Sequence, residues 1–154
     1  MKIRLLSVGK PREVVLSRLH DRYAERLVRL GVQYQTDHVS DVPAGRHYAT
    51  EHALEREARS LFERIRPGET VIALHDEGLS LTSRGLADLI ERWATPGATL
   101  IVGGPLGLHS SVLSRADHVW SLSPLTFPHE LVRVLIVEQL YRAVSIRRGF
   151  PYHK

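Results

Sequence analysis

The chain contains no cysteine among its 154 residues. This absence excludes a disulfide framework, a zinc site built from cysteine and catalysis by a thiol, and it suits a reducing compartment. The sequence also lacks an apolar run near the roughly 18 residues that a membrane-spanning helix requires. Arg4 and Lys10 interrupt the apolar stretch at the N-terminus, and no cleavage pattern of a signal peptide follows it. We therefore expect a cytoplasmic protein with no membrane partner.

Common nucleotide-binding and metal-binding motifs are missing as well. The adjacent pair Gly103-Gly104 does not form a dinucleotide-binding G-x-G-x-x-G, and no Gly-Lys-Ser/Thr occurs, which disfavours nicotinamide and nucleoside-triphosphate chemistry. His47 and His52 lie in and after a polar loop at a spacing that matches no metal motif, and His75-Asp76 lacks further ligands. We assign no metal and leave the role of the loop with His47 and His52 open.

Composition and charge leave several kinds of partner possible. Hydrophobic residues make up 43% of the chain and charged residues 25%, which is typical of a globular protein and not of a disordered one. Without an internal repeat, low-complexity tract or linker, residues 1–154 should form a single domain. The formal net charge of +4 permits a nucleic-acid partner through attraction to phosphates, but does not require one.

Strand and helix patterns alternate along the chain. Runs of β-branched and alternating apolar residues predict five strands, at residues 2–8, 32–39, 69–74, 98–102 and 118–122. Apolar residues at helical spacing predict helices at 12–30, 50–65, 82–95, 110–114 and 127–143, with a polar loop at 41–48. This alternation predicts an α/β fold with a mostly parallel sheet, helices on both faces and ligands at the carboxyl ends of the strands.

Two loops near the C-terminal half are candidates for a binding site. The stretch "LIVGGPLGLH", residues 100–109, runs from a buried strand into three glycines around a proline. Such a loop can offer its amides to a small molecule, or it can be a tight turn, and the motif alone does not decide. The stretch "SLSPLTFPHE", residues 121–130, is stiffened by Pro124 and Pro128, which suits a preorganised surface but is also common in structural loops.

The last helix carries an arginine inside its apolar arc. At four-residue spacing, His129, Arg133 and Val137 line up on one face. Arg133 cannot shed its charge, so it needs an anionic partner or a wet cleft. Glu138 and Arg142 form an ordinary i,i+4 pair. Apolar residues extend nearly all round this helix, so we expect a second partner, such as another subunit, to cover it.

The chain ends in a basic stretch with aromatic residues, "RRGFPYHK". Its cationic side chains could hold phosphates and its rings could stack on a base, although basic termini are more often solvated.

Three stretches, "GGPLGL" at 103–108, "WSLSPLTFPHELVRVLIVEQLYRA" at 120–143 and the terminal "PYHK", together resemble the ribosomal large subunit pseudouridine methyltransferase H family of the SPOUT class. The resemblance implies an α/β fold with a C-terminal trefoil knot, a known exception to the rule that chains avoid knots. It further implies a homodimer that binds S-adenosylmethionine and methylates N3 of a pseudouridine in large-subunit ribosomal RNA, within the assembled ribosome.

The resemblance also implies the site residues. The cofactor-binding positions would be Leu74, Gly103, Gly104, Leu122, Ser123, Pro124, Leu125, Thr126 and Phe127. The catalytic positions would be His129, Arg133 and His153, and the substrate-binding positions Arg142, Tyr152 and Lys154. Either histidine could accept the N3 proton while Arg133 offsets the developing negative charge, or Arg133 could instead hold a phosphate or the cofactor carboxylate.

Two rival hypotheses remain at this stage. The first is a noncatalytic ribosome-binding factor that uses the same basic tail. The second is a methyltransferase of the same class with another target, such as a transfer RNA base, because one fold can serve several substrates.

Overall fold

The computed structural model describes residues 1–45 and 49–154, and in them strands and helices alternate as the sequence predicts. The strands are β1 (Lys2–Val8), β2 (Gln33–Val39), β3 (Thr70–Ser80), β4 (Ala98–Val102) and β5 (His118–Ser121). The helices are α1 (Val14–Arg29), α2 (Thr50–Arg64), α3 (Ser83–Trp93), α4 (Ser110–Arg115) and α5 (His129–Arg147). None of these helices has the length and apolar character that crossing a membrane requires.

The five strands form one sheet in the order β2-β1-β4-β3-β5, and every neighbouring pair is parallel. The predicted parallel sheet is therefore confirmed. Because parallel strands need a crossover between them, the helices fall on the faces of the sheet and leave its carboxyl edge open to ligands.

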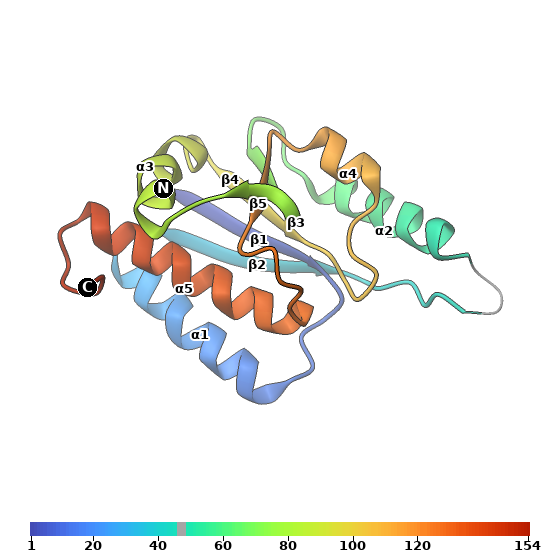
Figure 1. Ribbon diagram of the computed structural model, residues 1–154, viewed down its shortest axis with the longest axis horizontal. Coiled ribbons are helices and arrows are strands. Elements are labelled where there is room, and N and C mark those ends of the chain that lie inside the picture. The colour runs from blue at the N-terminus through green and yellow to red at the C-terminus, as the bar shows by residue number, and fades with distance from the viewer. Residues whose placement is uncertain (46–48) are drawn as a thin grey trace.

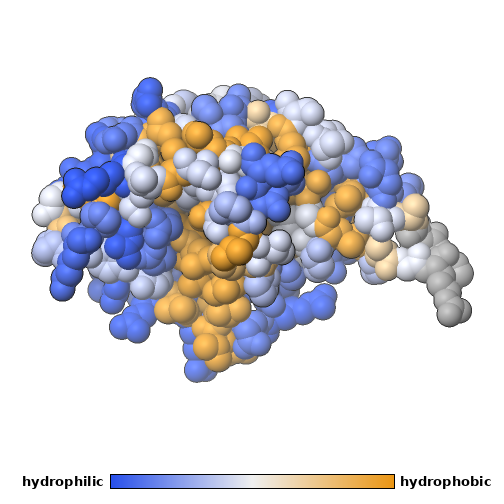
Figure 2. All heavy atoms as spheres, in the orientation of Figure 1, coloured by the Kyte–Doolittle hydropathy of each residue, from blue (hydrophilic) through white to orange (hydrophobic). Residues whose placement is uncertain are grey.

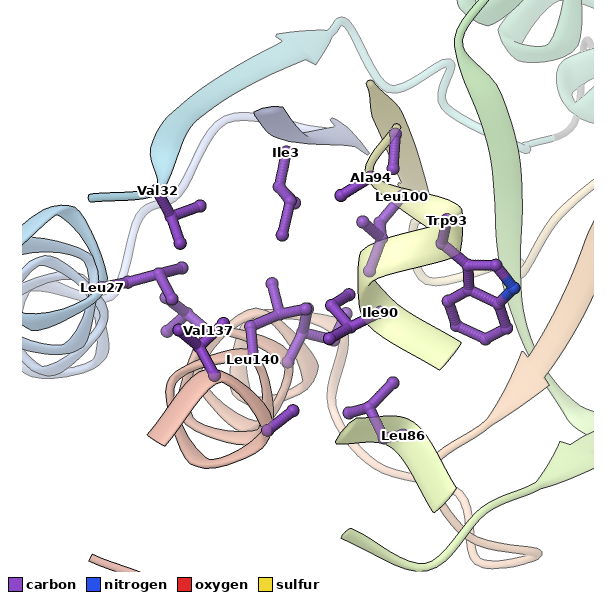
Figure 3. Packing of buried hydrophobic residues seen from close by; sticks show 14 of the residues in the cluster. Ile3, Leu27, Val32, Leu86, Ile90, Trp93, Ala94, Leu100, Val137 and Leu140 are labelled. Atoms are coloured by element: carbon purple, nitrogen blue, oxygen red, sulfur yellow. The ribbon is translucent and has the colours of Figure 1, made fainter. Parts of the chain in front are cut away.

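Helices cover both faces, as predicted. Figure 1 shows α1 and α5 side by side on one face, and α2 and α4 on the other. The larger core cluster joins α1, α3 and α5 to the sheet, with Leu27, Ile90, Val137 and Leu140 pointing toward one another (Figure 3). A smaller cluster packs α2 and α4 against the opposite face. The sheet is thus buried on both sides, which explains why β4 is buried along its whole length and β1 from Ile3 onward.

Strand β3 is longer than predicted, because it continues to Ser80 instead of ending at Leu74. Its pairing with β5 shifts in register between Leu74 and Leu79. Gly78 passes so close to β5 that an added Cβ would lie 2.8 Å from the main chain of Val119. The polar residues after Leu74 looked like a loop in the sequence, and only this tertiary pairing makes them part of a strand.

Arg4 is buried within the sheet but has a carboxylate partner. Its side chain is 5% exposed and donates hydrogen bonds to Glu69 at 2.8 Å and to Thr99 at 3.0 Å. Burial acts to raise the pKa of Glu69, but the hydrogen bonds from Thr99 and Arg4 outweigh it and hold that pKa below its ordinary value. The pair therefore stays ionised, and each buried charge is balanced by the other.

Candidate functional site

A cleft of about 640 Å³ opens at the carboxyl edge of the sheet, where β3, β4 and β5 end. This volume lies in the range of small-molecule sites, roughly 300–1,000 Å³. Eight of the nine predicted cofactor-binding residues line it, namely Leu74, Gly103, Gly104, Leu122, Ser123, Leu125, Thr126 and Phe127. Pro124 does not line it and is exposed.

The glycine loop after β4 forms one wall of this cleft. Gly107 donates a hydrogen bond to the Gly104 carbonyl at 3.0 Å and has a φ of +83°, so the loop closes as a tight turn. A Cβ on Gly103 would lie 2.5 Å from the Gly107 carbonyl oxygen, and a Cβ on Gly104 would lie 3.0 Å from Val8. The loop is thus a tight turn, as one of the two interpretations has it, and its main chain also lines a cleft. Binding of a small molecule by its amides stays a prediction.

The segment 122–127 between β5 and α5 forms the facing wall. The Ser123 hydroxyl accepts a hydrogen bond from the Leu125 amide at 3.1 Å, which stiffens the turn. Leu125 is 69% exposed although it lines the cleft.

Helix α5 begins at the cleft. Pro128 fixes the start of the helix, and His129 and Val132 of the first turn line the hollow beside it. His129 is the one predicted catalytic residue that lies on this wall. Its ring nitrogens can donate or accept a hydrogen bond at the cleft wall.

Arg133, one helical turn beyond His129 on α5, does not line the cleft but borders a separate hollow. It is 6% exposed, and its Nη2 donates to the Ser7 hydroxyl at 2.6 Å and to the Gly9 carbonyl. Burial lowers the pKa of this guanidinium from its ordinary value. Arg133 and His129 were predicted to share one site. Within a single chain, the two residues instead border different cavities.

The predicted substrate-binding residues gather at the far end of α5. The Glu138 carboxylate accepts hydrogen bonds from Arg142 at 2.5 Å and 3.1 Å and from the Tyr152 hydroxyl at 2.9 Å, so the predicted Glu138–Arg142 pair is present. Arg142 stacks over the Tyr152 ring at 4.7 Å, and His153 Nδ1 lies 3.5 Å from its guanidinium. Lys154 is exposed.

This cluster keeps Tyr152 protonated. Burial, aided by the hydrogen bonds with Tyr23 and Glu138, raises the pKa of the Tyr152 hydroxyl well above its ordinary value. Tyr152 is therefore a hydrogen-bond donor at any pH near neutral. About 20 Å of helix separates Arg142 from His129, at 1.5 Å per residue. One chain alone does not bring the tail to the cleft.

Several residues on the cleft wall were missed by the sequence-based prediction. They are His75, Asp76, Val102, Pro105, Gly107, Leu108, Trp120, Pro128 and Val132. Gly107 and Leu108 belong to the recognised "GGPLGL" stretch and were within reach of the sequence. His75 and Asp76 lie in the part of β3 beyond Leu74, which the sequence-based prediction did not include in the strand.

A group of possible metal ligands lies away from the cleft. Glu51, Glu55 and His109 bring one ligand atom each within 4.8 Å of one another. Both glutamates are exposed, and His109 hydrogen-bonds to Glu51 at 2.8 Å and to Ser111 at 2.7 Å, which accounts for the grouping without an ion. His52 lies in α2, whereas His47 falls outside the described residues.

Comparison with known proteins places the whole chain in one family. Residues 1–153 match the family model described as "Predicted SPOUT methyltransferase". The chain is 40% identical to a ribosomal RNA large subunit methyltransferase H from Anaeromyxobacter sp. (strain Fw109-5), covering 100% of both chains. It is also 40% identical to the protein of that name from Gloeobacter violaceus, covering 99% of both.

A solved structure supports the fold independently. The "probable methylase family protein" from Haemophilus influenzae Rd KW20 superposes with a TM-score of 0.56 at 14% sequence identity. The match covers 99% of this chain and 70% of that one. At this identity the likeness bears on the architecture alone.

Proposed function

The chain belongs to the SPOUT methyltransferase family, and on that premise we propose that it methylates N3 of a pseudouridine in large-subunit ribosomal RNA, with S-adenosylmethionine as methyl donor. The observation that carries the proposal is the cleft of about 640 Å³ walled by the glycine loop and residues 122–127. Full-length relatives named ribosomal RNA large subunit methyltransferase H support ribosomal RNA as the substrate class.

The residues of the cleft fit this cofactor. Gly103 packs so closely on the Gly107 main chain that no side chain fits there, and the main chain of this loop therefore lines the cleft. Leu74, Trp120 and Leu122 give the cleft an apolar lining suited to an adenine ring. When bound, S-adenosylmethionine supplies an electrophilic methyl group. The family implies a knotted C-terminal path, in which residues 122–127 would hold the cofactor.

The chemistry at N3 requires a proton acceptor. Pseudouridine N3 carries a proton between two carbonyls, and this proton has to leave as the new bond to carbon forms. His129 lies on the cleft wall, so we propose that its imidazole accepts the proton. Proton transfer of this kind contributes about a hundredfold to ten-thousandfold in rate. His153 remains the alternative base, whereas Arg133 is not assigned a role in this step, because it is bonded to Ser7 outside the cleft.

A homodimer would bring the two ends of α5 together. Figure 2 shows a band of hydrophobic residues across the face that carries α1 and α5. Val14, Val15 and Leu19 of α1 are exposed large apolar residues. We propose that a second copy covers this surface and presents Arg142, Tyr152, His153 and Lys154 of its own tail to the partner's cleft. The basic tail would then bind the RNA in the ribosome, in the cytoplasm.

Methyl transfer in vitro tests the proposal. Purified protein and labelled S-adenosylmethionine are incubated with large ribosomal subunits, whole ribosomes, free large-subunit RNA or transfer RNA. We expect label at N3 of pseudouridine, chiefly with assembled ribosomes, and about a hundredfold slower labelling by His129→Ala. Label in transfer RNA alone would identify the rival target. No label, together with no binding of S-adenosylhomocysteine, would identify a noncatalytic binding factor.

A further inference from the structure

Arg133 is a buried cation without a buried anion beside it. Its side chain is 6% exposed, and its Nε is buried without a hydrogen-bond partner. Its partners within the described chain are a hydroxyl and a carbonyl, Ser7 and Gly9. None of the ion pairs among the described residues includes it.

Arg4 is a second buried arginine, and unlike Arg133 it has an acidic partner. It is 5% exposed and also has an unpartnered Nε, but Glu69 lies 2.8 Å from its Nη2. Buried charges in proteins are normally paired, because an isolated one has lost its hydration without compensation. The same chain thus pairs one buried arginine with an acid and leaves the other without one.

A second hollow of about 100 Å³ lies beside Arg133, between α1, α5 and the ends of β1 and β2. The polar residues that line it are Ser7, Ser17, His20, Thr36, His38 and Arg133, together with the acidic Asp21, Asp37 and Glu130. Such a volume holds about three water molecules at roughly 30 Å³ each, or one tetrahedral oxyanion, but no nucleoside. Ser17, Thr36 and His38 use no side-chain hydrogen bond within the described chain and are open to a ligand's oxygens.

The acids that border this hollow are engaged elsewhere. The Glu130 carboxylate accepts the amides of Arg12 at 2.6 Å and Glu13 at 3.0 Å, and it acts on Arg133 from beyond ion-pair distance. Asp37 accepts from Arg64 at 2.9 Å and from the His38 amide at 2.8 Å. Asp21 lies 3.2 Å from the His20 ring. They attract Arg133 only at a distance and leave its guanidinium without a direct anionic partner among the described residues.

We propose that this second hollow binds a phosphate group, with Arg133 as its charge partner and the Ser17 and Thr36 hydroxyls as further donors. Arginine is the residue best suited to phosphate because its planar guanidinium offers several N–H donors at once. The phosphate has two possible sources, the backbone of an RNA or a free phosphate. The site is separate from the methyl-transfer cleft and does not depend on the proposed methylation.

Thermal unfolding in inorganic phosphate tests the site. The purified protein is titrated with sodium phosphate against sodium chloride at matched ionic strength, and Tm is followed. We expect a saturable rise in Tm for the wild type, as for any ligand that binds the folded state alone. Arg133→Met should weaken phosphate affinity roughly tenfold or more, the effect of removing a charged hydrogen-bond partner. Arg4→Met is the matched control, which should lower Tm but keep the rise with phosphate.

Three results would overturn the proposal. The first is no rise in Tm for the wild type, which would show that phosphate does not bind. The second is an equal rise in Tm for Arg133→Met, which would show that phosphate does not bind at Arg133. The third is loss of the rise in Arg4→Met, which would show that the effect is not specific to Arg133. If Arg133→Met does not fold, Thr36→Asp replaces it. Thr36 is exposed, so this variant adds a negative charge at the hollow without disturbing the core. It should lose the rise, and a normal rise would count against the site.

Competition distinguishes the two sources. Fluorescence anisotropy follows binding of a labelled RNA hairpin with and without inorganic phosphate at constant ionic strength. Displacement of the hairpin from the wild type but not from Arg133→Met identifies a backbone phosphate. If inorganic phosphate leaves RNA binding unchanged but still raises Tm, the ligand of the site is a free phosphate. Failure of the methylation assay leaves both readouts unaffected, so the two proposals fail separately.

Discussion

The two ends of helix α5 differ in what they offer a ligand. At the N-terminal end, His129 lines a wide cleft with largely apolar walls. At the C-terminal end, Arg142 and Tyr152 are held by Glu138 in a packed network of charges and rings. The N-terminal end thus offers a cavity, the C-terminal end offers hydrogen-bond donors, and about 20 Å of helix separates them. Cofactor binding and substrate chemistry should therefore be separable by mutation.

The largest effect, on cofactor affinity, should follow from adding a side chain at Gly103, in the loop that lines the cleft. In Gly103→Ala the new Cβ would meet the Gly107 carbonyl oxygen at 2.5 Å, and the main chain would have to move. We expect S-adenosylhomocysteine affinity, measured by calorimetry, to fall about a hundredfold, a loss of roughly 2.7 kcal/mol. Gly45→Ala is the control, because none of the described residues places an atom within 4 Å of its added Cβ. Unchanged affinity in Gly103→Ala would show that the glycine loop is a turn alone.

Removing the last three residues should impair methylation of the RNA and not cofactor binding. A chain that ends at Pro151 loses Tyr152, His153 and Lys154. We expect its kcat on ribosomes to fall about tenfold to a hundredfold, as for the loss of charged substrate contacts. Its affinity for S-adenosylhomocysteine should stay within about threefold of wild type. Parallel losses of both quantities would contradict the division between the two ends.

A smaller effect is expected when the tail is loosened but kept. Glu138→Gln weakens the hydrogen bonds that hold Arg142 and Tyr152. We predict a kcat roughly fivefold to tenfold lower with cofactor affinity unchanged. Glu91→Gln removes the partner of Arg147, an ion pair at the same end of α5. If both variants lose activity equally, general loosening of α5 rather than tail placement is responsible.

The smallest effect concerns stability at the N-terminal end. The Arg12 and Glu13 amides hold the pKa of Glu130 below its ordinary value. A carboxylate with a lowered folded-state pKa stabilises the protein above its unfolded-state pKa, about 4.3, and that stability is lost as pH falls through the folded-state value. Glu130→Gln should thus lower Tm by a few degrees at pH 7 and by less at pH 3.

The exposed Glu63→Gln on α2 is the control for Glu130→Gln and should leave Tm nearly unchanged at both pH values. If the difference in Tm between wild type and Glu130→Gln grew as the pH falls, the pKa of Glu130 would not be lowered in the folded protein.

The sequence predicted the architecture well because periodicity directly reflects burial. Strands β1 and β4 are buried on both faces, and both are mainly apolar, with Arg4, Ser7 and Thr99 as the polar residues of their buried part. It missed the second half of β3, since the polar run after Leu74 becomes a strand only by pairing with β5. Local pattern cannot reveal a register shift that depends on a distant strand.

For the site, the sequence was informative about the loops and less so about α5. The glycine loop and residues 122–127 are contiguous stretches, so recognising them also located the cleft. His129 and Arg133 were grouped because four residues return to nearly the same face, but each such step leaves about 40° of rotation. That rotation, with the length of the arginine side chain, carries Arg133 to Ser7 and away from the cleft.

The most direct test of the central claim is nucleoside mass spectrometry of large-subunit ribosomal RNA from cells with and without the gene for this chain. We predict N3-methylpseudouridine in cells with the gene, and unmethylated pseudouridine at that position in cells without it or with only Gly103→Ala. An unchanged N3-methylpseudouridine signal in cells without the gene would contradict the proposed function.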